Sequence, residues 1–166
     1  GEKLDDRTTA LIEAYIDGNL SELGIYGDDL PLAHRERIGC IVDYVSGRNR
    51  YIGYLISIAS HSYRDLRIGL DCANGASWMI AKAVFDALGA QTVVTGNKPD
   101  GLNVNNGCGS THIENLVKLV KEEHLDVGFA FDGDADRCIA VDENGKVVDG
   151  DGIMYILAQR LMDRGS

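Results

Sequence analysis

The stretch of sequence that decides the fold is VGFAFDGDADRCIAVD, residues 127–142. It begins and ends with apolar runs rich in Val, Ile, Ala and Phe, which predict two strands. Between these runs lie Asp132, Asp134 and Asp136, on alternate residues, followed by Arg137. Polar groups at the carboxyl end of a strand are typical of α/β sheets, which carry their functional groups at that edge.

The segments around this stretch alternate between strand and helix patterns. Short apolar runs predict strands, and apolar residues three and four apart predict helices. Strands are expected at residues 66–71, 92–94, 126–131, 138–141 and 147–148, and helices at 80–88, 113–120 and 152–162. Strand, helix, strand, helix, strand builds a mainly parallel sheet covered by helices. We therefore expect an α/β fold, a three-layer α/β/α sandwich with a mixed, mainly parallel sheet.

The first third of the sequence indicates helices on either side of a linker. Apolar residues with helical spacing predict a short helix that begins near Asp5 and ends before Gly18. Residues 19–33 contain glycines, a proline and several acids, which predict a loop. Apolar residues at positions 38, 41, 42, 45, 52, 55, 56 and 59 then predict one or two amphipathic helices. We place the domain boundary in the linker, with a short first part at residues 1–30 and the main domain at 31–166.

Composition excludes several classes of function. The 166 residues carry a formal net charge of −10, which disfavours binding to nucleic acid by charge neutralisation and favours a cation as partner. Residues 132–151 hold seven acids against two basic residues, so half of the net charge surrounds the aspartates. We find no secretory leader or membrane span. The cysteines are too far apart for a CxxC pair, and reduced, buried thiols in a cytoplasmic protein are expected.

The three aspartates form a candidate metal site. Their carboxylates repel one another at close range, so a hard cation or several backbone donors must offset the charge. Gly133 and Ala135 add no bulk between them, which lets the chain curl and direct three oxygens at one point. Three oxygen ligands with open positions suit Mg²⁺, which usually keeps water or a phosphate in its shell. Arg137 is the candidate contact for a phosphate oxygen beside the metal.

Three other interpretations of this loop are possible. It could be a solvated acidic turn between two strands. It could be a Ca²⁺ loop of the EF-hand type, with Glu143 at the twelfth position counted from Asp132, although Arg137 occupies the sixth position, where Gly is needed. It could also be the Asp-x-Asp motif of a phosphatase of the haloacid-dehalogenase type, with Asp132 as nucleophile. In that family, however, the motif usually opens the fold.

Several motifs together resemble one family. The loop from Phe131 to Arg137, followed by Val148-Asp149-Gly150-Asp151, is similar to the metal-binding loop of the α-D-phosphohexomutase superfamily. Asp71-Cys72-Ala73-Asn74-Gly75-Ala76 resembles the strand-loop-helix that opens the second domain of its members. The stretches at residues 99–105 and 108–112 resemble the phosphoglucosamine mutase branch in particular.

The resemblance implies a reaction and a distribution of the catalytic groups over several domains. Family members have four domains, and this sequence is similar to the second one with a remnant of the first. The implied reaction is the reversible conversion of glucosamine 6-phosphate to glucosamine 1-phosphate through a bisphosphate. The three aspartates would hold Mg²⁺, a phosphoserine from the first domain would complete its shell, and Arg137 would contact phosphate. The chain alone is therefore expected to be inactive. Another phosphohexomutase, for phosphomannose or phosphoglucose, is the alternative within the superfamily.

Other polar residues have structural interpretations. Ser60, in Ala59-Ser60-His61-Ser62, resembles the phosphoserine loop only superficially, because the Asn-Pro that should follow is missing. We expect Ser110 and Thr111 to cap the helix that follows them, with a backbone hydrogen bond for His112. We expect Asp151 to cap the last helix. Asp149 is expected to support the metal loop.

Overall fold

The structure is a computed structural model that describes the chain apart from residues 1, 20, 22–23, 25–32, 164 and 166. Its internal contacts divide the chain into two units, Gly1–Asp43 and Tyr44–Ser166, which are described separately below. The predicted domain boundary between residues 30 and 31 lies outside the described residues and stays a prediction. None of the helices in the described part of the chain has both the length and the apolar content needed to cross a bilayer.

The first unit contains the predicted opening helix, α1 (Asp6–Ile16). The carboxylate of Asp5 caps it by accepting hydrogen bonds from the backbone N–H of Thr8 at 2.8 Å and from its hydroxyl at 2.9 Å. An aspartate at this position satisfies amide groups that have no partner within the helix. The sequence-based prediction of this helix is therefore confirmed.

The helix predicted to run through residues 38–45 is wrong in its first part. After a short 3-10 helix, η2 (Arg35–Arg37), the chain is extended at Ile38, and an α-helix begins only at α2 (Val45–Ile58). Ile38, Ile41 and Val42 are 65%, 102% and 76% exposed, so packing against the described residues does not stabilise a helix there. Most helical stability in proteins comes from burying the apolar face, which the sequence pattern alone does not guarantee.

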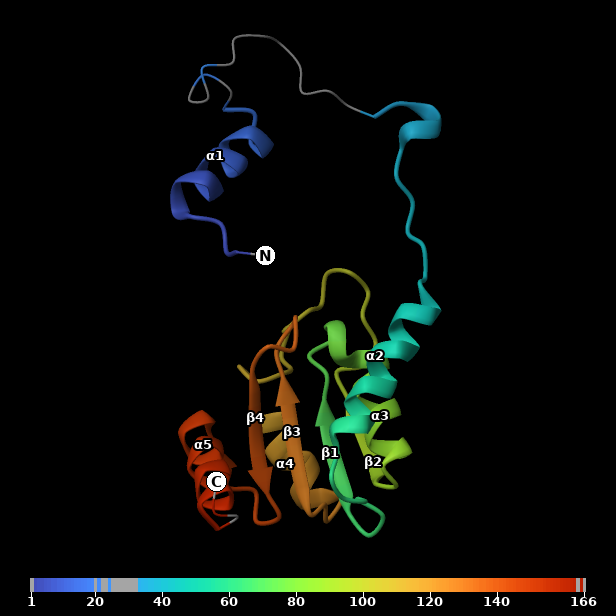
Figure 1. Cartoon of the computed structure of the whole chain (residues 1–166), viewed down its shortest axis with the longest axis vertical. Coiled ribbons are helices and arrows are strands. Elements are labelled where there is room, and N and C mark those ends of the chain that lie inside the picture. Colours follow the sequence, from blue (N-terminus) through green and yellow to red (C-terminus); the bar gives the residue numbers. More distant parts are fainter. Residues whose placement is uncertain (1, 20, 22–23, 25–32, 164, 166) are drawn as a thin grey trace. The chain divides into compact units, whose positions relative to one another are not determined.

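The second unit is built on a five-stranded sheet with the strand order β2-β1-β3-β4-β5 (Figure 1). Neighbouring strands are parallel in the β1–β2 and β1–β3 pairs and antiparallel in the β3–β4 and β4–β5 pairs. Four of the five strands therefore run in one direction and β4 runs against them. The strands are β1 (Arg67–Asp71), β2 (Gln91–Thr95), β3 (Val127–Phe131), β4 (Cys138–Asp142) and β5 (Val147–Val148).

Helices cover both faces of this sheet, which confirms the three-layer α/β/α fold. On one face lies α4 (Glu114–Glu122), packed against β1, β3 and β4. On the other face α3 (Ala81–Ala87) packs through Phe85, which stacks on Phe129 of β3 at 5.8 Å between ring centroids. The helix α2 packs on α3, and a short 3-10 helix, η3 (Ala76–Met79), precedes α3. The last helix, α5 (Gly150–Asp163), contacts β4 and β5.

The two sides of the sheet have separate hydrophobic cores. Ile68, Leu70 and Cys72 of the β1 segment pack toward α3, whereas Leu116 and Val120 of α4 form the second core. Leu70, Cys72, Leu116 and Val120 have no exposed surface, and Ile68 is 2% exposed. The predicted alternation of strands and helices thus leads to a sheet that is rigidly packed on both faces and can hold loops at its carboxyl edge.

Candidate metal centre

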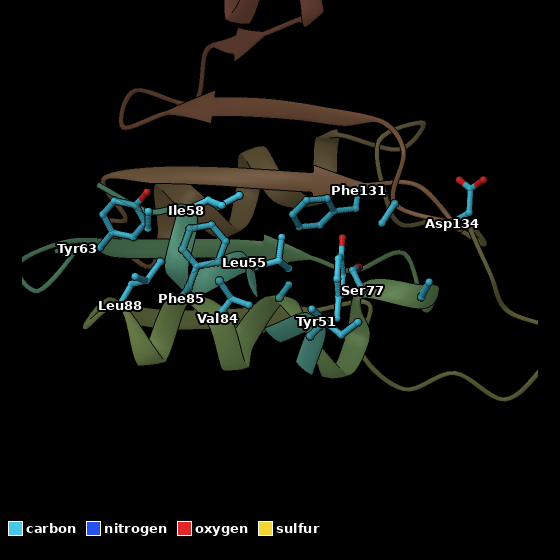
Figure 2. A pocket seen from close by; sticks show the side chains of 15 residues that line it. Tyr51, Leu55, Ile58, Tyr63, Ser77, Val84, Phe85, Leu88, Phe131 and Asp134 are labelled. Atoms are coloured by element: carbon cyan, nitrogen blue, oxygen red, sulfur yellow. The ribbon is translucent and has the colours of Figure 1, made fainter. Parts of the chain in front are cut away.

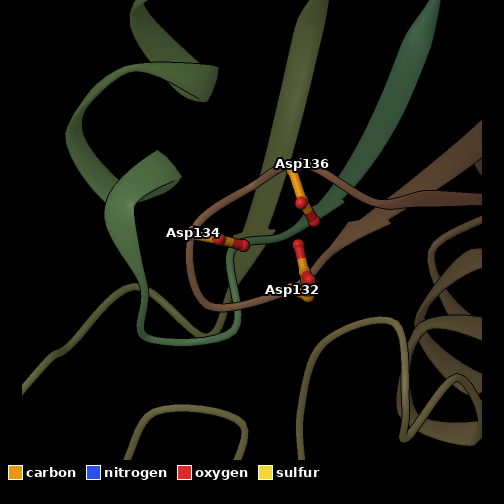
Figure 3. Close-up of side chains that lie close together, drawn as sticks. All are labelled: Asp132, Asp134 and Asp136. Carbon is orange, nitrogen blue, oxygen red and sulfur yellow. The ribbon is translucent and has the colours of Figure 1, made fainter. Parts of the chain in front are cut away.

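The three aspartates lie on the loop that joins β3 to β4, at the carboxyl end of β3. Because β1, β2 and β3 are parallel, the loops that follow these strands meet at the same edge of the sheet. Each of Asp132, Asp134 and Asp136 offers a carboxylate oxygen, and these oxygens all lie within 4.8 Å of one another (Figure 3). The structure therefore brings together the three residues that the sequence singles out.

The backbone of the loop curls so that the side chains converge. Ala135 has a φ of +63°, in the left-handed region, and its N–H donates to the carbonyl oxygen of Asp132 at 3.1 Å. The N–H of Arg137 donates to Oδ1 of Asp132 at 3.1 Å. These two bonds close a tight turn around Asp132, as the small residues between the aspartates predict.

The carboxylates are not electrostatically equivalent. The backbone N–H of Arg137 is the main reason why the pKa of Asp132 lies below its ordinary value. Asp136 shows the opposite behaviour: the negative charges of Asp134 and, to a lesser extent, Asp132 raise its pKa. A cation at the point where the three meet would remove the repulsion that causes this rise.

Arg137 contributes positive charge at the rim of the loop. Its Nε lies 3.8 Å from Oδ2 of Asp132 and 3.9 Å from Oδ1 of Asp136, and its side chain is 76% exposed. Such exposed ion pairs contribute little to stability. An exposed guanidinium beside the carboxylates is accessible to an anionic ligand, so a phosphate contact by Arg137 stays a prediction that fits the geometry.

The donor set fits a hard divalent cation. All three ligands are carboxylate oxygens, which Mg²⁺ and Ca²⁺ prefer, and two of them belong to exposed side chains that can rotate to close the 4.8 Å span. Three protein oxygens leave coordination positions open for water or phosphate, as is usual for Mg²⁺. The flanking strands β3 and β4 differ from the two helices that frame an EF-hand loop.

Two neighbouring loops hold the acidic loop from the side. The N–H of Ala76 donates to the carbonyl of Gly133 at 2.8 Å, and the N–H of Ser110 donates to the carbonyl of Phe131 at 2.8 Å. A Cβ atom at Gly75 would overlap the carbonyl of Gly133. The approach of these loops is close enough to require glycine at position 75.

An apolar cavity of about 540 Å³ opens beside the loop, between α2, α3 and the sheet (Figure 2). Tyr51 and Leu55 of α2, Phe85 of α3 and Phe131 of β3 line it, and Asp134 lies at one end. Most of its lining is hydrocarbon, and Asp134 is the charged residue among the lining residues.

Several other sequence-based predictions need correction. Ser110 and Thr111 do not cap α4, which begins at Glu114 and has Ile113 at the capping position with no side-chain hydrogen bond. The carboxylate near the start of α5 that accepts from a backbone amide is Asp149, through the N–H of Gly152 at 3.0 Å, rather than Asp151. In both cases the helix begins at a different residue from the one expected, and the cap follows the helix start.

The remaining predicted residues are placed as follows. Ser60 is exposed in the segment after α2, where its hydroxyl lies 2.7 Å from Nδ1 of His61. The backbone N–H of His112 donates to the carbonyl of Gly109 at 3.0 Å, and its ring lies 3.6 Å from Oε1 of Glu114. All four cysteines are free. Cys72 and Cys108 are buried as expected, whereas Cys40 and Cys138 are exposed.

Sequence reasoning includes Asp71, at the end of β1, in a motif but assigns it no role of its own. It is fully buried, and both of its carboxylate oxygens accept hydrogen bonds from backbone N–H groups in the loops beside the acidic loop. The signal that was available is an aspartate at the carboxyl end of an apolar strand, directly before a turn. The same signal identified Asp132.

Comparison with known proteins assigns the family. A family model described as phosphoglucomutase/phosphomannomutase, alpha/beta/alpha domain II, matches residues 49–145, more than half of the chain. The chain belongs to the phosphoglucomutase/phosphomannomutase family. The matched region includes the acidic loop and the strands that carry it. It corresponds to the second domain of this family, in agreement with the fold described above.

Curated relatives in this family are named phosphoglucosamine mutase. The chain is 57% identical over 164 residues to the protein from Lachnospira eligens, 53% identical over 165 residues to that from Lachnoclostridium phytofermentans, and 47% identical over 165 residues to that from Streptococcus pneumoniae. These alignments cover 99% of this chain but 35% of each relative, so the chain spans about a third of their length.

A solved structure in the same family has a similar fold. It is a phosphoglucomutase/phosphomannomutase family protein from Burkholderia thailandensis, with a TM-score of 0.62 and 29% sequence identity. The superposition covers 71% of this chain and 26% of that protein.

Proposed function

We propose that this chain is the metal-binding domain of a phosphoglucosamine mutase. The observation that carries the proposal is the convergence of Asp132, Asp134 and Asp136 on the β3–β4 loop, within the residues that match the family's second domain. The identity of 57% to a protein named phosphoglucosamine mutase supports this branch over one acting on phosphomannose or phosphoglucose. The reaction would interconvert glucosamine 6-phosphate and glucosamine 1-phosphate in the cytoplasm.

In this function the residues of the chain have separate roles. The three aspartates would hold Mg²⁺, which when bound supplies positive charge that stabilises a phosphoryl group during its transfer. Arg137 would bind a phosphate oxygen next to the site, because its guanidinium is exposed and already lies beside two of the carboxylates. The nucleophilic serine and the contacts to the sugar would come from other domains of the parent enzyme.

The first test is a calorimetric titration of the chain with Mg²⁺ and with Mn²⁺. We expect saturable binding that Asp134→Asn abolishes, since this change removes one of three anionic ligands. Asp65→Asn is the matched control, because it removes the same charge from an exposed aspartate before β1, at the opposite end of that strand. Absence of binding heat with both metals in the unmodified chain would contradict the proposed site.

A competition experiment distinguishes this proposal from a Ca²⁺-binding module. Mn²⁺ bound to the chain is displaced with increasing Mg²⁺ or Ca²⁺. We expect Mg²⁺ to displace Mn²⁺, and we expect inorganic phosphate to strengthen this competition, since three ligands leave positions that phosphate can fill. A strong preference for Ca²⁺, increased further by Arg137→Gly, would favour the Ca²⁺-binding module instead.

A further inference from the structure

Asp71 carries a carboxylate that is completely buried, which is unusual for a charged side chain. Its exposed fraction is 0%, and it lies at the end of β1, between the loops that follow β1 and β2. Oδ1 accepts from the N–H of Ala73 at 3.0 Å and Oδ2 accepts from the N–H of Gly109 at 2.8 Å. Burying a carboxylate is costly unless it is hydrogen-bonded, so these bonds require both loops to stay in place.

Both of these loops are also hydrogen-bonded to the acidic loop. Next to Gly109, the N–H of Ser110 donates to the carbonyl of Phe131 at 2.8 Å. Three residues after Ala73, the N–H of Ala76 donates to the carbonyl of Gly133 at 2.8 Å. The two acceptors are the residues immediately before and after Asp132. The carbonyl groups of the residues on either side of the first aspartate are therefore both held by segments that Asp71 ties together.

The packing leaves little room for these segments to move independently. A Cβ atom at Gly109 would lie 2.7 Å from the carbonyl oxygen of Phe131, and one at Gly75 would overlap the carbonyl of Gly133. A Cβ atom at Gly96 would lie 2.5 Å from Oδ1 of Asp71 itself. Groups in such close contact transmit a displacement instead of absorbing it.

We propose that Asp71 is a positioning residue for the metal loop: it fixes the backbone on both sides of Asp132 and thereby sets the spacing of the three carboxylates. This inference rests on the proposed metal site. Asp71 itself does not belong to the group of carboxylates that converge among the described residues. Groups that orient metal ligands in this way commonly change metal affinity by about tenfold or more when they are altered.

Asp71→Asn tests the proposal, because it keeps the size of the side chain and replaces one acceptor oxygen with a donor. One of the two backbone N–H groups then faces another N–H. We expect the dissociation constant for Mn²⁺ to rise by about tenfold at temperatures where circular dichroism shows the variant to be folded. The electron paramagnetic resonance spectrum of bound Mn²⁺ should change as well, which a purely structural role would not cause.

Asp126→Asn is the matched control. Asp126 accepts from the N–H of Arg67 at 2.7 Å, at the opposite end of the same two strands, β1 and β3. The substitution weakens a similar hydrogen bond between a carboxylate and a backbone N–H, at the end of the strands that is far from the metal loop. We expect Mn²⁺ affinity and the resonance spectrum to be unchanged in this variant, whatever happens to its melting temperature.

A second variant keeps the test decisive if Asp71→Asn does not fold. Ala76→Pro removes the N–H that donates to Gly133, at the first position of η3, where proline is tolerated. We expect it to weaken Mn²⁺ binding by about tenfold as well. Unchanged affinity in a folded Asp71→Asn or Ala76→Pro variant, or an equal loss in Asp126→Asn, would overturn the positioning role. Absence of Mn²⁺ binding by the unmodified chain would overturn the proposed function together with it.

Discussion

At the scale of single residues, the acidic loop places two carboxylates with opposite pKa shifts, Asp132 and Asp136, close together. Asp132 accepts a backbone hydrogen bond that lowers its pKa, while the charges of Asp134 and Asp132 raise the pKa of Asp136. This inequality follows from the curl of the loop, which directs one amide at the first aspartate and leaves the third facing its neighbours. Protons therefore compete with a cation more effectively at Asp136 than at Asp132.

We predict that metal affinity depends on the protonation of Asp136. Protonation removes an anionic ligand, so affinity falls as pH falls through the raised pKa of Asp136 and reaches its plateau only above that pKa. The midpoint should lie above the ordinary aspartate value of about 4. Mn²⁺ titrations at a series of pH values measure it. Asp136→Asn should lower the plateau and remove this part of the profile, whereas a midpoint at or below the ordinary value would contradict the prediction.

The sequence predicts which residues carry a chemical function better than it predicts which groups hydrogen-bond to them. Alternate acids after an apolar strand form a local pattern that identifies the three aspartates, and the five residues from Asp132 to Asp136 suffice to bring them together. The role of Asp71 was missed because its two donors, Ala73 and Gly109, are placed by tertiary structure rather than by sequence spacing. The cap of α5 at Asp149 was assigned to the wrong aspartate because two acids stand close together at the start of that helix.

At the scale of elements, α4 lies very close to the sheet. Gly69 of β1 and Gly128 of β3 are paired in register and both face α4. A Cβ atom at Gly128 would lie 2.7 Å from Cγ2 of Val120 and 3.0 Å from Cδ1 of Leu116. Two paired glycines thus form a flat area of sheet on which the helix lies.

We predict that Gly128→Ala lowers the free energy of unfolding by about 1–3 kcal/mol, because the added methyl group overpacks this contact. Equilibrium unfolding in urea measures the change. Gly53→Ala is the control: Gly53 lies on the exposed side of α2, and a Cβ there would have no atom within 4 Å. That substitution should stabilise the helix by about 0.5–1 kcal/mol. Stabilisation by Gly128→Ala would show that α4 can move away from the sheet at little cost.

The elements themselves were largely predictable, for reasons that also explain the exception. The strands at the centre of the sheet and the helices α3 and α4 have apolar faces that are buried, so pattern and structure agree. The apolar residues at positions 38–42 have helical spacing too, but they remain exposed and the chain there is extended. A sequence pattern shows that a face could be buried, whereas only the tertiary structure supplies the surface that buries it.

At the scale of the whole molecule, the chain forms a sheet that helices cover on both sides, and it spans about a third of the length of its aligned relatives. The proposed function places a metal site and a phosphate-binding arginine in the second unit, and the aligned relatives are nearly three times as long. Under this proposal the nucleophile and the sugar-binding groups belong to the remaining length.

We predict that the chain alone does not convert glucosamine 6-phosphate to glucosamine 1-phosphate. Phosphorus nuclear magnetic resonance with Mg²⁺ and a sugar bisphosphate present measures the conversion. The phosphoglucosamine mutase from Lachnospira eligens is the positive control, since it is 57% identical over the shared region. Turnover by the chain alone that Asp134→Asn abolishes would show that it contains a nucleophile of its own.

The antiparallel pairing of β3 with β4 has a consequence for transplanting the site. All three carboxylates lie on one hairpin, so a segment copied from residues 127–142 would carry all three proposed aspartate ligands into another protein. The groups that shape this hairpin, however, lie at the end of β1 and in the loops after β1 and β2. Ser110 lies 22 residues before Asp132 in the chain, and Asp71 lies 61 residues before it. A hairpin grafted into another protein would keep these aspartates but lose the contacts that hold their backbone in this chain.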